Sequence, residues 1–148
     1  RLNMKKNRIL WMFAILMLVI GMSSCSSDDE DVAVYDDNPT TLDGTWYLVK
    51  ANFGWGGIRD YEAGDVTVCF YPNQTVQVET KEVKVFMATG TYSYKVIDTQ
   101  TNKYDGTVFT TINLGGQQCT YWFEDGMMVL DYGMAYDGPG YYFKKKLQ

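Results

Sequence analysis

The strongest constraint on the fold is a repeated alternation of short β-branched and aromatic runs with turn residues, which fills the chain from Gly44 onward. The runs recur at intervals of about 8–12 residues, and no long stretch has the period of an amphipathic helix. The three prolines fall between the runs, as their missing amide donors require. This pattern predicts an all-β domain of antiparallel strands. The expected strands are 45–52, 66–71, 75–79, 83–87, 90–97, 108–114, 118–123, 127–131 and 140–145.

About eight antiparallel strands in a meander can close into a barrel, which removes the unpaired edges of an open sheet. Residues 90–97 alternate tyrosine and valine with polar residues, which is typical of a strand with one buried face. Residues 83–87 are apolar without alternation, so a strand is the assignment there and a helix the alternative. The sequence therefore predicts a single small barrel, with an open β-sandwich as the alternative fold.

The segment 44–46 (Gly-Thr-Trp) opens the first expected strand. It resembles the Gly-x-Trp signature of the lipocalin and wider calycin families, and both ends of the domain resemble small lipocalin-like lipoproteins of unknown function. The resemblance implies that Gly44 lets the chain enter the barrel floor tightly and that the Trp46 indole plugs the closed end. Full lipocalins are longer and place an arginine near the C-terminus against this tryptophan. Here Lys144 or Lys145 is the available cation.

The N-terminal residues have the pattern of an export signal that ends at a cysteine. Lys5 and Lys6 precede an uncharged stretch at 9–21, which is shorter than the about 20 residues of a bilayer span but fits a signal-peptide core. Two serines and Cys25 follow. This arrangement resembles a bacterial lipoprotein signal, which implies that residues 1–24 are removed and that Cys25 is acylated and anchored in a membrane. Several acyl chains make such anchoring stable.

An acidic tether is expected at residues 25–43, because seven acids and no base lie between Cys25 and Gly44. Nine bases and eighteen acids follow Cys25, so the mature net charge is −9, whereas the domain at 44–148 is close to neutral. Such sequence stays extended and unfolded. Residues 26–31 resemble the acid-rich address for the outer face of a Gram-negative outer membrane; a periplasm-facing lipoprotein is the alternative. A net-acidic chain without basic clusters is a poor nucleic-acid binder.

The sequence indicates a protein without catalytic chemistry. It has no histidine, which removes the usual general base and the commonest metal ligand. Asp60, Glu62 and Asp65 lie in a polar turn region, where solvation accounts for them. No motif for a metal, a phosphate or another cofactor is present, so we expect no enzyme activity, no metal and no cofactor. Cys69 and Cys119 are expected to be buried free thiols, with a disulfide as the alternative.

The aromatic residues supply the candidate binding site. Phe53 and Trp55 lie among glycines in the loop after the first expected strand, and Tyr136 lies in a second glycine-rich loop before the last one. Aromatic side chains on such loops need a cover: they either cap the barrel's own core or contact a ligand or a partner. Trp122 and Tyr94 complete the expected contacts. The first expectation is a non-catalytic, surface-exposed lipoprotein that binds a small apolar or amphipathic molecule in the barrel mouth.

The alternative function is an interaction module that contacts a protein or a glycan, as an inhibitor-like barrel or as an accessory subunit of a surface complex. The two expectations differ in the barrel interior. A large internal cavity lined by Trp122 and Tyr94 favours the small ligand. A solid core with Phe53 and Trp55 projecting outward favours the interaction module.

Overall fold

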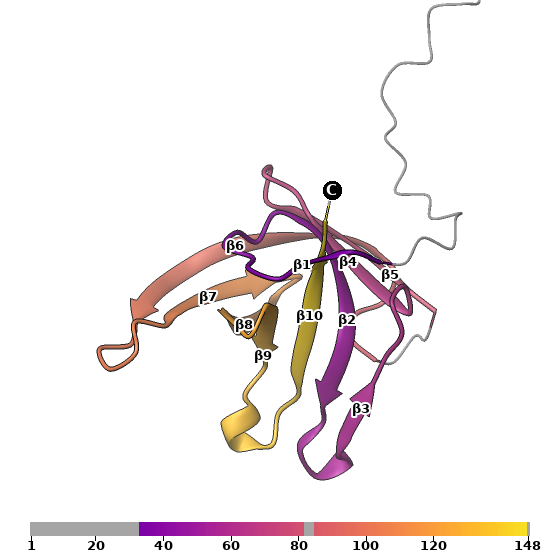
Figure 1. Cartoon of the computed structure of the whole chain (residues 1–148). Coiled ribbons are helices and arrows are strands. Elements are labelled where there is room, and N and C mark those ends of the chain that lie inside the picture. Colours follow the sequence, from indigo (N-terminus) through magenta and orange to yellow (C-terminus); the bar gives the residue numbers. More distant parts are fainter. Residues whose placement is uncertain (1–32, 82–84, 148) are drawn as a thin grey trace, which may run out of the picture. The chain divides into compact units, whose positions relative to one another are not determined.

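The computed structural model describes residues 33–81 and 85–147, and in them the fold is all-β. Eight antiparallel strands form a barrel (Figure 1). The last strand, β10, pairs with β2 through residues 140–145, so the sheet closes on itself. This closure confirms the expected barrel and excludes the open β-sandwich. The barrel strands are β2 (Gly44–Asn52), β4 (Val66–Phe70), β5 (Thr75–Thr80), β6 (Gly90–Thr101), β7 (Val108–Leu114), β8 (Gln117–Glu124), β9 (Met127–Asp131) and β10 (Gly140–Lys146).

Two short strands lie outside the barrel. β1 (Tyr35–Asp36) pairs with the end of β10, and β3 (Ile58–Asp60) pairs with the end of β2. Residues 33–43, the second half of the expected tether, belong to the same compact unit as the barrel. They pack against it through β1, and Leu42 is buried. The first half of that tether, Cys25 and the expected signal peptide lie at residues 1–32, outside the described residues.

The barrel interior is packed with apolar side chains, because alternate residues of each strand point inward. The Trp46 indole, fully buried, stacks on the Phe123 ring with centroids 5.9 Å apart and an angle of 13° between the planes. Burying a large apolar side chain stabilises a fold by about 1.5–3 kcal/mol, so this interior supplies most of the stability. Other fully buried members are Leu48, Val66, Val76, Val78, Ile112, Met128, Leu130 and Phe143.

One end of the barrel, here called the closed end, is organised by Trp46. Its Nε1 donates a hydrogen bond to the Leu42 carbonyl oxygen at 2.7 Å. Gly44 has φ +117°, a left-handed conformation that favours glycine, at the point where the chain turns into β2. The Lys145 ammonium lies 5.4 Å from the Trp46 ring and donates at 3.0 Å to the carbonyl and the hydroxyl oxygen of Thr41. A lysine thus contacts the tryptophan at the C-terminal strand.

The opposite end, here called the loop end, is covered by aromatic rings. The strand expected at 83–87 is absent from the part of that segment that the structure describes: residues 85–87 form bends between β5 and β6, and residues 83 and 84 lie outside the described residues. Instead, the Phe86 ring makes edge contacts with three rings of the loop end. These rings, at centroid distances of 6.3, 4.9 and 5.5 Å, are Tyr132, Tyr141 and Phe143.

Candidate functional site

Trp55 stands on a tight turn at the loop end, the short 3-10 helix η1 (Gly54–Gly56). The Asn52 side chain accepts a hydrogen bond from the Gly54 amide at 3.0 Å, and the Gly57 amide donates to the Gly54 carbonyl at 3.0 Å. The turn is therefore held by its own hydrogen bonds. Trp55 is 92% exposed, which is unusual for a tryptophan.

Tyr136 stands on a second turn of the same kind, η2 (Met134–Tyr136), between β9 and β10. One oxygen of the Asp131 carboxylate accepts the amides of Gly133 and Met134, both at 2.6 Å. The Tyr136 amide donates to the Gly133 carbonyl at 2.8 Å. The phenol ring is 91% exposed although its backbone is fixed.

The two turns lie against each other. In Figure 1 they are the loops that lead into β3 and β10, at the bottom of the view. A Cβ atom at Gly54 would lie 3.0 Å from the Asp137 carbonyl oxygen, and Gly54 has φ +59°, so only glycine fits there without strain. Exposed Ile58 follows η1 at the start of β3. We call the exposed rings of Trp55 and Tyr136, together with the neighbouring Ile58, the aromatic tip.

The remaining expected contacts lie away from the aromatic tip. The Phe53 ring is half-buried: it forms a T-shaped pair with the Tyr141 ring (centroids 6.2 Å apart), and the Arg59 guanidinium lies 5.5 Å from its centre, so it supports the turn instead of projecting outward. Tyr94 is buried inside the barrel, where its hydroxyl donates to the Tyr71 carbonyl at 3.2 Å.

Trp122 lies on the outer face of the barrel, which corrects its expected place in the barrel mouth. Its neighbours Tyr121 and Phe123 pack against the core, so the alternation of β8 turns Trp122 outward. The Trp122 indole contacts the Phe109 ring, with centroids 5.3 Å apart. Sequence reasoning missed Phe109. The signal was the alternation along β7, which places Phe109 and Thr111 on the face opposite to the inward-facing Thr110 and Ile112.

Cys69 and Cys119 are free and buried, as expected from the sequence. Burial raises the pKa of the Cys119 thiol to about 11, against the opposing effect of its hydrogen bond with Tyr132. Cys119 is therefore a neutral thiol at physiological pH and a poor nucleophile. The Cys69 sulfur lies 3.5 Å from the Thr45 hydroxyl. Both thiols are buried, so neither has the exposure of a reactive cysteine.

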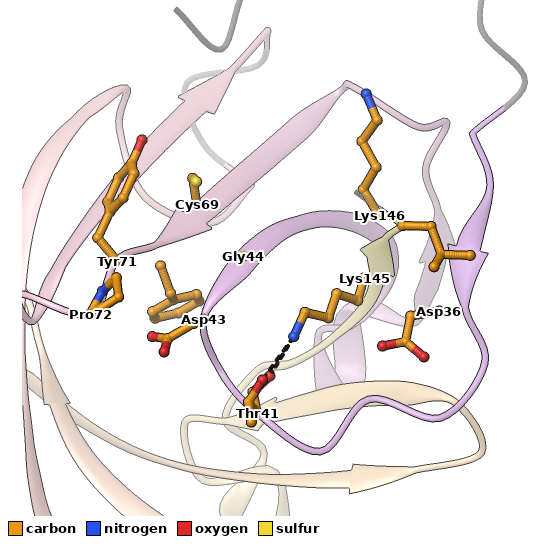
Figure 2. A pocket seen from close by; sticks show the side chains of 11 residues that line it. Asp36, Thr41, Asp43, Gly44, Cys69, Tyr71, Pro72, Lys145 and Lys146 are labelled. Carbon is orange, nitrogen blue, oxygen red and sulfur yellow. Dashed lines mark hydrogen bonds between the residues drawn. The ribbon is translucent and has the colours of Figure 1, made fainter. Parts of the chain in front are cut away.

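A pocket of about 550 Å³ lies at the closed end, between the start of β2, the end of β4 and the C-terminal residues. Figure 2 shows Asp43, Cys69 and Pro72 on one side and Lys145 and Lys146 on the other. The Lys145 ammonium is already engaged by Thr41 (dashed line in Figure 2). The walls of the pocket carry charges of both signs, from Asp43 on one side and from Lys145 and Lys146 on the other.

Within residues 33–81 and 85–147, no three histidine, cysteine or acidic side chains come together in a way that would hold a metal ion. No helix in the same residues combines the length and hydropathy needed to cross a bilayer. Comparisons with family models, with curated proteins and with solved structures returned no match.

Proposed function

We propose that this chain is a non-catalytic, membrane-tethered binding module that contacts its partner with the aromatic tip. The observation that carries the proposal is the pair of nearly fully exposed rings, Trp55 and Tyr136, on adjacent turns. Tryptophan and tyrosine are the residue types that most often dominate binding energy at interfaces. The hydrogen bonds that hold both turns before any partner arrives lower the entropy cost of binding.

The packing of the loop end favours an interaction module over a small ligand enclosed in the barrel. The Phe86 and Tyr141 rings, 4.9 Å apart, occupy the place where such a ligand would enter. A small apolar molecule needs an enclosed site to bury most of its surface. The exposed rings of the tip instead suit a larger partner that covers them from outside.

The described chain starts beside β1, at the closed end, whereas the aromatic tip lies at the loop end (Figure 1). In the proposal, Cys25 carries the lipid anchor and the acidic residues 26–31 direct the protein to the cell surface, with a periplasm-facing orientation as the alternative.

Photo-crosslinking tests the proposal on cells that display the full chain. A benzophenone amino acid at position 58, which is 66% exposed in the tip, is expected to crosslink one partner. The crosslink is expected to disappear in the Trp55→Ala and Tyr136→Ala variants. A second crosslinker at Tyr104, which is 98% exposed on the β6–β7 hairpin, is the matched control for a surface aromatic outside the tip. Crosslinking that persists in both tip variants would refute the proposal.

A further inference from the structure

A second set of aromatic side chains lies on the outer wall of the barrel, in register across neighbouring strands. Trp122 on β8 is paired with Val129 on β9, and Val129 with Tyr142 on β10. The Phe109 ring on β7 extends this row through its contact with Trp122. Lys50 on β2 ends it, with its ammonium 4.0 Å from the centre of the Tyr142 ring. We call these five residues the outer row.

The outer row is held in place before any ligand binds. The Trp122 Nε1 donates to the Glu124 carboxylate at 2.6 Å, which fixes the plane of the indole. Val129 has 0% exposure although it is not part of the barrel core, because the larger side chains of the row flank it. Phe109 and Trp122 are half-buried and contact each other at the wall. Rings fixed in this way lose little conformational entropy on binding.

The outer row is continuous with the aromatic tip. The Tyr142 hydroxyl lies 3.8 Å from the Met134 sulfur, and Met134 starts the turn that carries Tyr136. From Phe109 to Tyr142 the row crosses three strand spacings, about 14 Å at the usual distance between strands. The tip and the row together therefore form an elongated surface instead of a compact patch.

The surroundings of the row restrict what can cover it. β7, β8, β9 and β10 each pair on both sides, so an extended peptide cannot bind there by adding a strand. The nearby carboxylates of Glu124 and Asp131 disfavour a nucleic acid or another polyanion. Polar side chains also flank the rings, including the Thr111 and Thr120 hydroxyls, which lie 3.2 Å apart.

We infer that the partner of this surface is a neutral carbohydrate chain, which lies along the outer row and reaches the aromatic tip. The inference rests on the proposed function and names its partner class. The apolar faces of successive sugar rings stack on Phe109 and Trp122, and the hydroxyl groups bond to the threonines and carboxylates beside them. A ligand with apolar faces and polar edges matches a wall that alternates in the same way.

Affinity electrophoresis of the full mature chain tests this inference. The protein, with Cys25→Ala to keep it free of lipid, runs through gels that contain hydroxyethyl cellulose, xyloglucan, galactomannan, xylan or glycogen. At least one polymer is expected to retard it. Trp122→Ala and Phe109→Ala are expected to weaken that binding about tenfold, as is Trp55→Ala, whereas Tyr104→Ala leaves it unchanged. The circular dichroism spectrum and urea midpoint of each variant show that it is folded.

The outcomes separate this inference from the proposed function. Retardation that Trp122→Ala and Phe109→Ala do not change, or no retardation by any of the five polymers, overturns the carbohydrate inference. If position 58 instead crosslinks a protein, and that crosslink disappears in Trp55→Ala but persists in Trp122→Ala, the carbohydrate inference fails and the proposed function stands. If Trp55→Ala and Tyr136→Ala change neither the crosslink nor the retardation, the proposed function fails.

Discussion

The replacement Trp46→Phe measures how far the closed end holds the barrel together. It removes the indole N–H, so the Leu42 carbonyl oxygen loses the hydrogen bond of 2.7 Å. An unsatisfied buried acceptor costs about 1–3 kcal/mol. The smaller ring also leaves part of the fully buried Trp46 site empty beside Phe123, and the contact with the Lys145 ammonium is weakened. Together we expect a loss of about 2–4 kcal/mol in the free energy of unfolding.

Equilibrium urea unfolding, followed by circular dichroism, checks this value. With a denaturant dependence of about 1–3 kcal/mol per molar, the urea midpoint should fall by about 0.7 M or more. Trp55→Phe is the matched control, because Trp55 is 92% exposed, and a surface change of this kind alters stability by about 0.5 kcal/mol or less. A free energy of unfolding for Trp46→Phe within about 0.5 kcal/mol of that of the control would refute the role assigned to the closed end.

Three further predictions concern the tip, the interior and the anchor. Gly54→Ala puts a Cβ 3.0 Å from the Asp137 carbonyl in a left-handed conformation, so we expect a loss of about 1 kcal/mol in urea unfolding together with weaker partner crosslinking; an unchanged crosslink would contradict the turn contact. The pKa of Cys119 rises from 9.0 to about 11 on folding, which favours the neutral thiol, so its stabilising contribution is present below pH 9 and is lost toward pH 11. Cys119→Ala should therefore flatten the decline of the urea midpoint between pH 8.5 and 10.5, and an equally steep decline would count against the assignment. Cys25→Ala is expected to move the protein from the membrane fraction to the soluble fraction, and unchanged fractionation would exclude lipidation at that residue.

Much of the barrel could be predicted from the sequence because its strands are short and bounded by clear turn residues. The expected runs at 108–114 and 127–131 coincide with β7 and β9. The turn chemistry explains why: Asp125 and Gly126 both have positive φ, as a tight hairpin between β8 and β9 requires. Gly44 and Trp46 could also be singled out, because their positions depend on local backbone conformation and on the start of one strand.

The sequence could not decide which face of β8 is inside. Residues 121–123 are three consecutive aromatic side chains, so they have no alternation, and a shift of one residue exchanges the two faces. The pairing with β7 and β9 places Trp122 outside, beside Phe109. The outer row therefore exists only as a product of register between strands that are separate in the sequence.

The sequence by itself determined the all-β class, most strand positions, the two loops that carry Trp55 and Tyr136, and the glycine and tryptophan of the closed end, because local conformation and periodicity are enough for these. Tertiary structure decided that β10 returns to β2 and that Phe86 packs over the loop end instead of joining the sheet. It also decided that Gly54 meets Asp137 and so brings the two turns together. Each of these depends on contacts between distant segments, whose energies follow from complementary shape and register across the whole barrel.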